Sequence, residues 1–163
     1  WSMRNGYALA TNHGLVEIAE RLASCTEADR DALRRLVGIG MQWNTQVTAD
    51  GCTHTVSQAY CSALPVAYSN HSSDAWEDFA RLVLEATYEA TLCAAILNAG
   101  DTGNNQVFLT RLGGGAFGNR TEWIIESLER ALLLYRKHDL RVVIVSYGAS
   151  NRFVRELVSG FAQ

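Results

Sequence analysis

Four glycines lie within six residues of this chain, between a run that favours a strand and a run that favours a helix. Residues 112–119 read Leu-Gly-Gly-Gly-Ala-Phe-Gly-Asn, after an apolar segment at 107–110 and before a helical pattern that starts near Thr121. Glycines strip side chains from a turn, and a helix start adds unpaired N–H groups with a positive dipole end. The segment therefore predicts a phosphate-binding turn. The alternative is a strand-to-helix turn that binds nothing.

The composition limits the class of protein. The 163 residues are 48% hydrophobic and carry a net charge of -3, which predicts one globular domain and disfavours a nucleic-acid polymer as partner. Four scattered cysteines show no metal-ligand spacing and fit a reducing compartment. With no apolar run near the roughly 20 residues of a membrane span and no signal peptide, we expect a cytoplasmic protein that contacts no membrane. Because Trp1 comes first, we expect a fragment that lacks upstream elements.

Helical and strand patterns alternate along the chain. Helical spacing predicts helices over residues 15–22, 26–38, 73–100, 121–138 and 150–161. Strands are predicted over residues 7–10, 56–68, 106–110 and 141–146. The last two are continuous apolar runs, typical of strands buried on both faces of a parallel sheet. We therefore predict an α/β fold with three layers, α/β/α, and a mostly parallel central sheet, with residues 38–55 as a loop.

Strand ends in this arrangement bring further residues toward the glycine turn, because ligands sit at the carboxyl ends of parallel strands. The strand over 141–146 is followed by Tyr147 and Gly148, and the first strand is followed by Asn12. Tyr147 could stack on a base or be a half-buried packing residue, and the residues leave both readings open. Asn12 offers both a donor and an acceptor to a ribose.

Three carboxylates are candidates for acid–base chemistry. Glu85 and Glu89 are four residues apart on one helix face, where they could form a shielded acid–base pair or where Arg81 could pair with Glu85. Asp50 is an isolated acid in the segment that we expect to be a loop.

The residues after position 56 resemble the C-terminal half of a divergent macrodomain. The resemblance rests on residues 106–119, Trp123-Ile124 and residues 142–148, with support from residues 56–68 and 88–92. It is most similar to bacterial effector-type macrodomains and their eukaryotic relatives, which remove ADP-ribose from arginine. The first loop of such domains, an Asn-Ala-Ala-Asn segment followed by glycines, has only a partial match at residues 10–12.

The resemblance implies a single macrodomain-like domain over residues 1–163 that binds ADP-ribose or ADP-ribosylated protein without metal or cofactor. Its phosphate loop would consist of Gly113, Gly114, Gly115, Ala116, Phe117, Gly118 and Asn119. Tyr147 would lie against the adenosine. Hydrolysis of the ADP-ribosyl bond would need a carboxylate to orient water, for which Asp50 and Glu17 are the candidates. The alternatives are a non-catalytic reader of ADP-ribose, a NAD- or nucleotide-binding domain, and an α/β domain that only binds other proteins.

Overall fold

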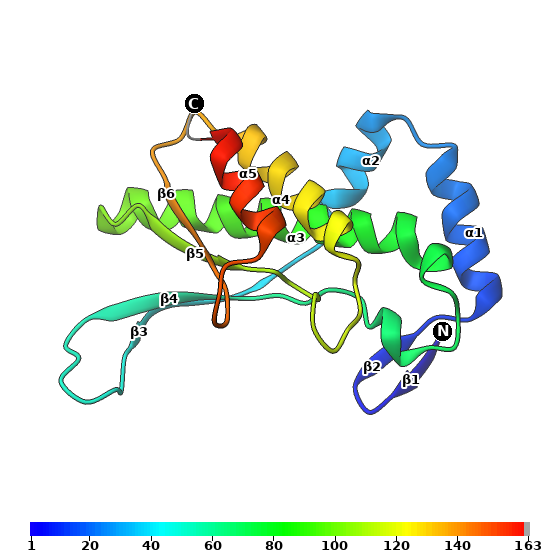
Figure 1. The fold of residues 1–163 in the computed structure, drawn as a ribbon, viewed down its shortest axis with the longest axis horizontal. Coiled ribbons are helices and arrows are strands. Elements are labelled where there is room, and N and C mark those ends of the chain that lie inside the picture. The colour runs from blue at the N-terminus through cyan, green and yellow to red at the C-terminus, as the bar shows by residue number, and fades with distance from the viewer. Residues whose placement is uncertain (162–163) are drawn as a thin grey trace.

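The chain alternates short strands with helices of very different length (Figure 1). The computed structural model describes residues 1–161. The helices are α1 (Asn12–Ala23), α2 (Glu27–Arg34), α3 (Ser73–Thr102), α4 (Thr121–Tyr135) and α5 (Arg152–Phe161). The strands are β1 (Ser2–Arg4), β2 (Tyr7–Leu9), β3 (Gly40–Gln46), β4 (Thr55–Tyr60), β5 (Gln106–Thr110) and β6 (Arg141–Val145), and a short 3-10 helix, η1 (Val66–Tyr68), lies before α3.

The six strands form three separate two-stranded sheets. β1 pairs with β2 and β3 with β4, both antiparallel, while β5 and β6 form a parallel pair. The structure is therefore a mixed α/β fold, but the predicted three-layer fold with one parallel central sheet is wrong. The physical reason is exposure: Phe108 in β5 is 61% exposed, so this strand is not covered on both faces as the prediction required.

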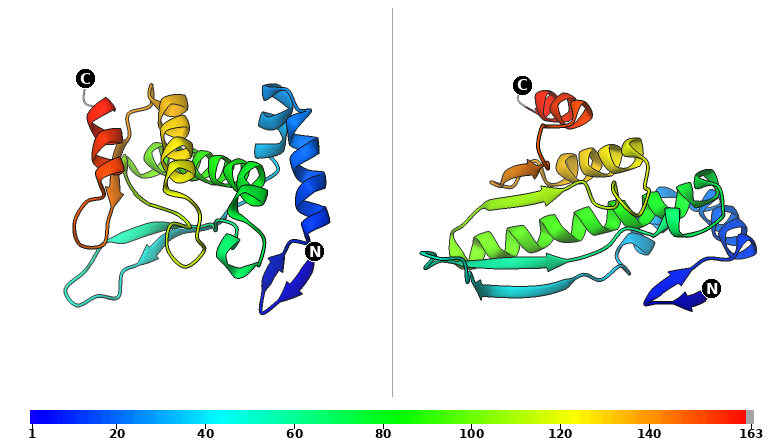
Figure 2. Two further views of the ribbon diagram at one scale, coloured as in Figure 1. Left: turned by 45° about the vertical axis from the view of Figure 1, so that its right-hand side comes forward. Right: turned by 60° about the horizontal axis from the view of Figure 1, so that its bottom comes forward.

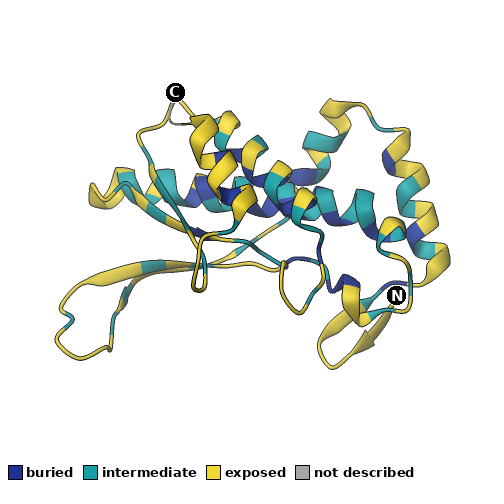
Figure 3. Ribbon diagram, viewed as in Figure 1, coloured by how far each residue is buried: buried dark blue, intermediate teal, exposed yellow. Residues whose placement is uncertain are grey.

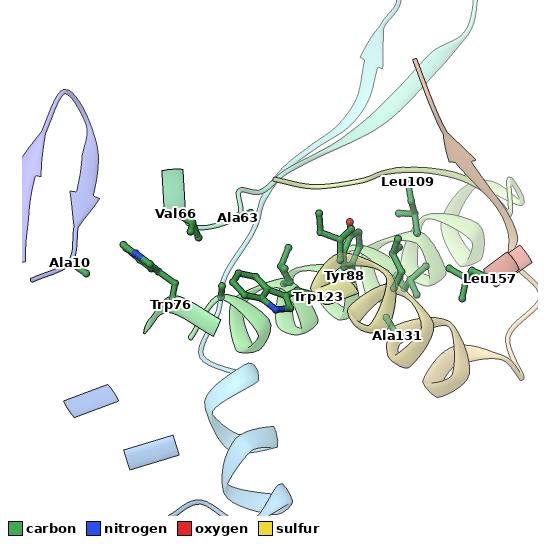
Figure 4. Close-up of a cluster of buried hydrophobic side chains, with 14 of the residues drawn as sticks. Ala10, Ala63, Val66, Trp76, Tyr88, Leu109, Trp123, Ala131 and Leu157 are labelled. Carbon is green, nitrogen blue, oxygen red and sulfur yellow. The ribbon is translucent and has the colours of Figure 1, made fainter. Parts of the chain in front are cut away.

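Helix α3 is the axis of the structure. Its 30 residues begin after the N-cap Ser72, whose hydroxyl accepts from the Ala75 N–H, and end at Gly103 in the left-handed conformation. The core runs along this helix, where side chains from α1, α4, β5 and α5 join it. Figure 4 shows Trp123, Leu109 and Leu157 as the contributions of α4, β5 and α5. Trp76 on α3 and Trp123 on α4 are both fully buried in that core.

The helix predictions are largely confirmed. The Thr26–Asp29 capping box forms at the start of α2, with the Thr26 hydroxyl accepting from the Asp29 N–H. One loop prediction and one strand prediction are wrong. Residues 40–46, expected in a loop, form β3. The long strand expected over 56–68 stops at Tyr60, which pairs with Gly40 at the start of β3, and Pro65 then leads the chain into η1.

A cluster of ion pairs joins α2, α3 and α4. Arg34, 5% exposed, donates to Glu85 at 2.7 Å and also contacts Glu27 and Asp31. Arg130 on α4 pairs with Asp31 at 2.9 Å and with Glu89. The expected pair of Arg81 with Glu85 is wrong, because Arg81 instead bridges Glu77 and Glu126. Glu85 and Glu89 are thus partners of arginines that hold helices together.

Helix α3 is long and apolar enough, by length and composition, to cross a membrane. That is weak evidence, since the central helix of a soluble protein passes the same test. In the structure α3 packs against α1, α2 and α4 and carries core residues along its length. This packing is compatible with a soluble protein.

Candidate functional site

The glycine turn between β5 and α4, residues 112–119, keeps its shape through two glycines that face protein. Gly113 and Gly118 have φ angles of +74° and +69°, which side chains rarely adopt. A Cβ on Gly113 would lie 2.4 Å from the Ala63 Cβ, and one on Gly118 would lie 2.7 Å from the Ala67 Cβ. These two glycines therefore press the turn against residues 63–67.

Asn119 holds the same turn from inside. It is 5% exposed, and its Nδ2 donates to the Leu64 carbonyl at 2.9 Å. Its backbone N–H donates to the Gly113 carbonyl, which closes the turn. Within residues 1–161 its Oδ1 has no hydrogen-bond partner. Asn119 is thus a structural clamp with one acceptor unused.

The other side of the turn is open to solvent. A Cβ placed on Gly115 would meet nothing within 4 Å, and Ala116 beside it is exposed. In the described part of the chain, the N–H groups of Gly115, Ala116 and Phe117 donate to no protein acceptor. Helix α4 starts here as well, and its N-cap residue Arg120 provides no side-chain cap. The turn therefore contains several backbone donors without a protein acceptor and leads into the positive end of a helix.

Three aromatic rings gather beside these donors. Phe117 of the turn meets Tyr7 of β2 and Tyr68 of η1, with ring centroids 5.9 and 5.4 Å apart. Tyr7 and Tyr68 are 5.1 Å apart, and all three pairs are edge-to-face. Both tyrosines are more than one-third exposed. The cluster gives the turn a partly exposed aromatic wall built from three distant segments.

Tyr88 on α3 fixes the entry to the turn. Its hydroxyl donates to the Thr110 carbonyl and accepts from the Leu112 N–H, both at 2.8 Å. Burial raises the pKa of the Tyr88 phenol well above its usual value, so the hydroxyl stays protonated. The end of β5 is thereby tied to the central helix.

Two arginines flank the turn. Arg120 stacks on the Trp123 ring at 5.2 Å from its centroid and pairs with Asp74, so its charge is already matched. Arg111, directly before the turn, is half-buried and forms no ion pair with any residue in 1–161. Arg111 is therefore the positively charged side chain next to the turn in sequence that could balance the charge of a bound anion.

The other predicted ligand residues lie apart from the turn. Tyr147 is fully exposed, so it is not the half-buried packing residue of the alternative reading, and Gly148 beside it has a φ of +71°. Their loop, between β6 and α5, starts beside the loop between β5 and α4, because Val145 is paired with Thr110, and then diverges from it (Figures 1 and 2). Asn12 is the exposed first residue of α1, after the N-cap Thr11.

The two candidate catalytic acids do not come together. Asp50 lies in the tip of the β3–β4 hairpin, at one end of the long axis, and α1, which carries Glu17, lies at the other (Figure 1). Glu17 is 3.3 Å from His13 on the exposed face of α1. The structure therefore does not assemble a pair of acids at the glycine turn from these residues.

Comparison with protein-family models, with curated proteins and with solved structures gives no match. Residues 1–161 also contain no group of three or more His, Cys, Asp or Glu side chains that could hold a metal ion. The geometry of the glycine turn and its neighbours is therefore the basis for a functional proposal.

Sequence reasoning identified the turn but missed the residues around it. Tyr7, Tyr68 and Tyr88 are separated from the turn by roughly 110, 50 and 25 positions, so no local spacing links them. Arg111 lies inside the segment that carries the family resemblance, and its position next to the glycines was the one available signal.

Proposed function

We propose that this chain binds ADP-ribose, free or attached to protein, at the turn of residues 112–119. The observation that carries the proposal is the set of unpaired N–H groups of Gly115, Ala116 and Phe117 beside the uncapped start of α4. Such donors suit a diphosphate. The aromatic wall of Tyr7, Tyr68 and Phe117 offers rings for the ribose or the base. The choice of ADP-ribose over other diphosphates rests on the resemblance of the turn to that of macrodomains.

The proposed function is binding in the cytoplasm, with hydrolysis as a separate question. Asp50 and Glu17 lie at opposite ends of the structure, so they form no pair at the turn, and the proposal of binding depends on neither. A reader of ADP-ribosylated protein needs only the turn and the aromatic wall. Incubation with protein ADP-ribosylated on arginine distinguishes the two: released ADP-ribose would make the chain a hydrolase, and capture without release would make it a reader.

Calorimetric titration tests the proposal. ADP-ribose should bind more tightly than ADP, and adenosine should bind far more weakly because it lacks the groups that the amides meet. NAD should bind more weakly than ADP-ribose. If NAD binds tightest, the site is a dinucleotide site, and if none of these compounds binds, the proposal is wrong.

A charge placed in the turn provides the matched variant. Gly115→Glu adds bulk and a negative charge where the diphosphate is expected, and should weaken ADP-ribose binding by at least about 100-fold. The fold should survive, since a Cβ at Gly115 meets nothing. Gly38→Glu is the control, because Gly38 is also open and lies in the segment between α2 and β3. Equal affinity of the two variants would exclude the turn as the site.

A further inference from the structure

A second surface lies away from the glycine turn, between the two sheets formed by β3–β4 and β5–β6. It is a groove of ≈ 890 Å³ with β4 on one side, β5 on the other, and the second half of α3 as its floor. Figure 2 (right) shows α3 behind the space between these strands. Thr91, Ala95 and Asn98 of α3 line the floor with short side chains. These short side chains leave room for an occupant between the two strand edges.

Both walls of the groove are unpaired strand edges. β4 is paired only with β3, and β5 only with β6, throughout residues 1–161. Each strand thus presents backbone N–H and C=O groups that another strand could pair with. An isolated two-stranded hairpin is at best marginally stable, and three or more strands are needed for independent stability. The β3–β4 hairpin projects from the body with most of its residues exposed (Figure 3).

The side chains around the groove are those of a protein interface. Trp43, Tyr60 and Phe108 line it and are 45%, 55% and 61% exposed. Among the residues that the structure describes, those lining the groove include no Asp, Glu, Lys or Arg. Aromatic enrichment with depletion of charge is typical of the centre of a protein–protein interface. A charged polymer or a membrane headgroup finds no counter-charge here.

The total surface is too large for a monomer of this size. The accessible surface is 10232 Å² for a mass of 17.9 kDa. A folded monomer of this mass exposes about 8,000 Å², so the excess is roughly 2,200 Å² per chain. Covering that excess in two chains would bury up to about 4,400 Å², which lies within the range of stable homodimers.

We propose that a second copy of this chain covers the groove, with β4 of each copy lying against the free edge of β5 in the other. This two-fold arrangement pairs the groove-facing edges of β4 and β5 in both copies with the same contacts. It converts the two-stranded sheets into two four-stranded sheets that run β3–β4 from one copy and β5–β6 from its partner. The exposed aromatic side chains become buried between the copies.

Sedimentation of the 163-residue chain tests the oligomeric state. Across roughly three decades of micromolar concentration, the mass should rise to twice 17.9 kDa. A monomer at every concentration would overturn the proposal, and would mean that β4 closes on its own β5 or that a strand from another protein fills the groove.

A charged substitution on the free edge tests the surface. Phe108→Lys should weaken dimerisation by at least about tenfold, because the interface would bury an unpaired charge. Leu36→Lys is the matched control, since Leu36 is 80% exposed and does not line the groove. Should Phe108→Lys fail to fold, Val56→Lys in β4 tests the same contact from the other strand. A dimer that both edge variants leave intact would use another surface, and the proposal would be wrong.

Amide hydrogen exchange tests the pairing itself. Amides in β4 and β5 should exchange more slowly in the parent than in the monomeric Phe108→Lys variant. Unchanged exchange in these strands between dimer and monomer would contradict the strand pairing, even if the chain dimerises.

Discussion

The end of the molecule built on α1, α2, α4 and the first half of α3 is packed and charge-matched, whereas the end built on the β3–β4 hairpin is open. Trp76 and Trp123 are fully buried in the first region, while Trp43 in the second is 45% exposed. Ion pairs follow the same division: Arg34 and Arg130 bind four carboxylates between α2, α3 and α4. Figure 3 shows buried residues gathered on α3 and α4 and few on the hairpin. The difference teaches that the two ends of one long helix lie in surroundings of very different packing and charge.

The largest expected effect compares two tryptophans. Trp123→Ala should lower the free energy of unfolding by about 3–5 kcal/mol, because it leaves a large cavity in the core. Trp43→Ala should change it by less than about 0.5 kcal/mol, as for other surface positions. Urea unfolding followed by circular dichroism, at concentrations low enough to limit association, measures both. Equal losses would show that the hairpin belongs to the same core.

A pair of glycines with nearly the same backbone conformation sharpens the comparison. Gly113 and Gly51 have φ angles of +74° and +77°, but only Gly113 faces packed atoms. Gly51→Ala should cost about 1–2 kcal/mol of backbone strain. Gly113→Ala should cost roughly 2–4 kcal/mol, since overpacking against Ala63 is added to that strain. If urea unfolding gives equal costs, the turn is not pressed against residues 63–67.

Removing one carboxylate from each kind of ion pair gives a smaller difference. Glu85→Ala deprives the buried Arg34 of a charged partner and should cost about 1.5–3 kcal/mol. Glu126→Ala removes an exposed partner of Arg81 and should cost less than about 1 kcal/mol. Thermal unfolding at neutral pH compares the two variants. A larger loss for Glu126→Ala would contradict the importance of the buried cluster.

The smallest expected effect is a dependence on pH. The hydrogen bond from Arg34 holds the pKa of Asp31 below its ordinary value of 3.8. A lowered pKa in the folded state stabilises the fold above pH 3.8, and this stabilisation is lost as the pH falls through the folded value. Asp31→Asn should therefore be less stable than the parent at neutral pH and approach it in acid. The urea unfolding midpoints of the parent and of Asp31→Asn are compared at both pH values. A difference between them that grows as the pH falls would contradict the expected direction.

The helices were predictable because their signals are local. Thr26 and Asp29 form a capping box three residues apart, and the stripe from Trp76 onward marks α3. The parallel pairing of β5 with β6 also followed from two apolar runs joined through a helix. In contrast, β3 is polar, and Asn44 interrupts its register with a φ of +52°, so no alternation marks it as a strand.

The candidate site was half predictable for the same reason. A cluster of glycines is visible in the sequence, and it does form an exposed turn with free amides at Gly115 and Ala116. The sequence could not show that Gly113 and Gly118 serve packing, because their contacts Ala63 and Ala67 lie about 50 residues earlier. The ends of β5 and β6 do lie side by side, with Thr110 opposite Val145, but the loop that carries Tyr147 then diverges from the turn (Figures 1 and 2).

The length of α3 has a consequence for the order in which the chain assembles. At 30 residues α3 spans about 45 Å, and it is the longest helix among the described residues. Its first half meets α1 and α2, which are made before it, so that half can be covered as soon as it emerges. Both halves also pack against α4, and the second half packs against β5, and these two elements are made later. A nascent chain emerging N-terminus first would thus carry α3 with its second half not yet packed. Chaperone binding would be expected at residues 91–102.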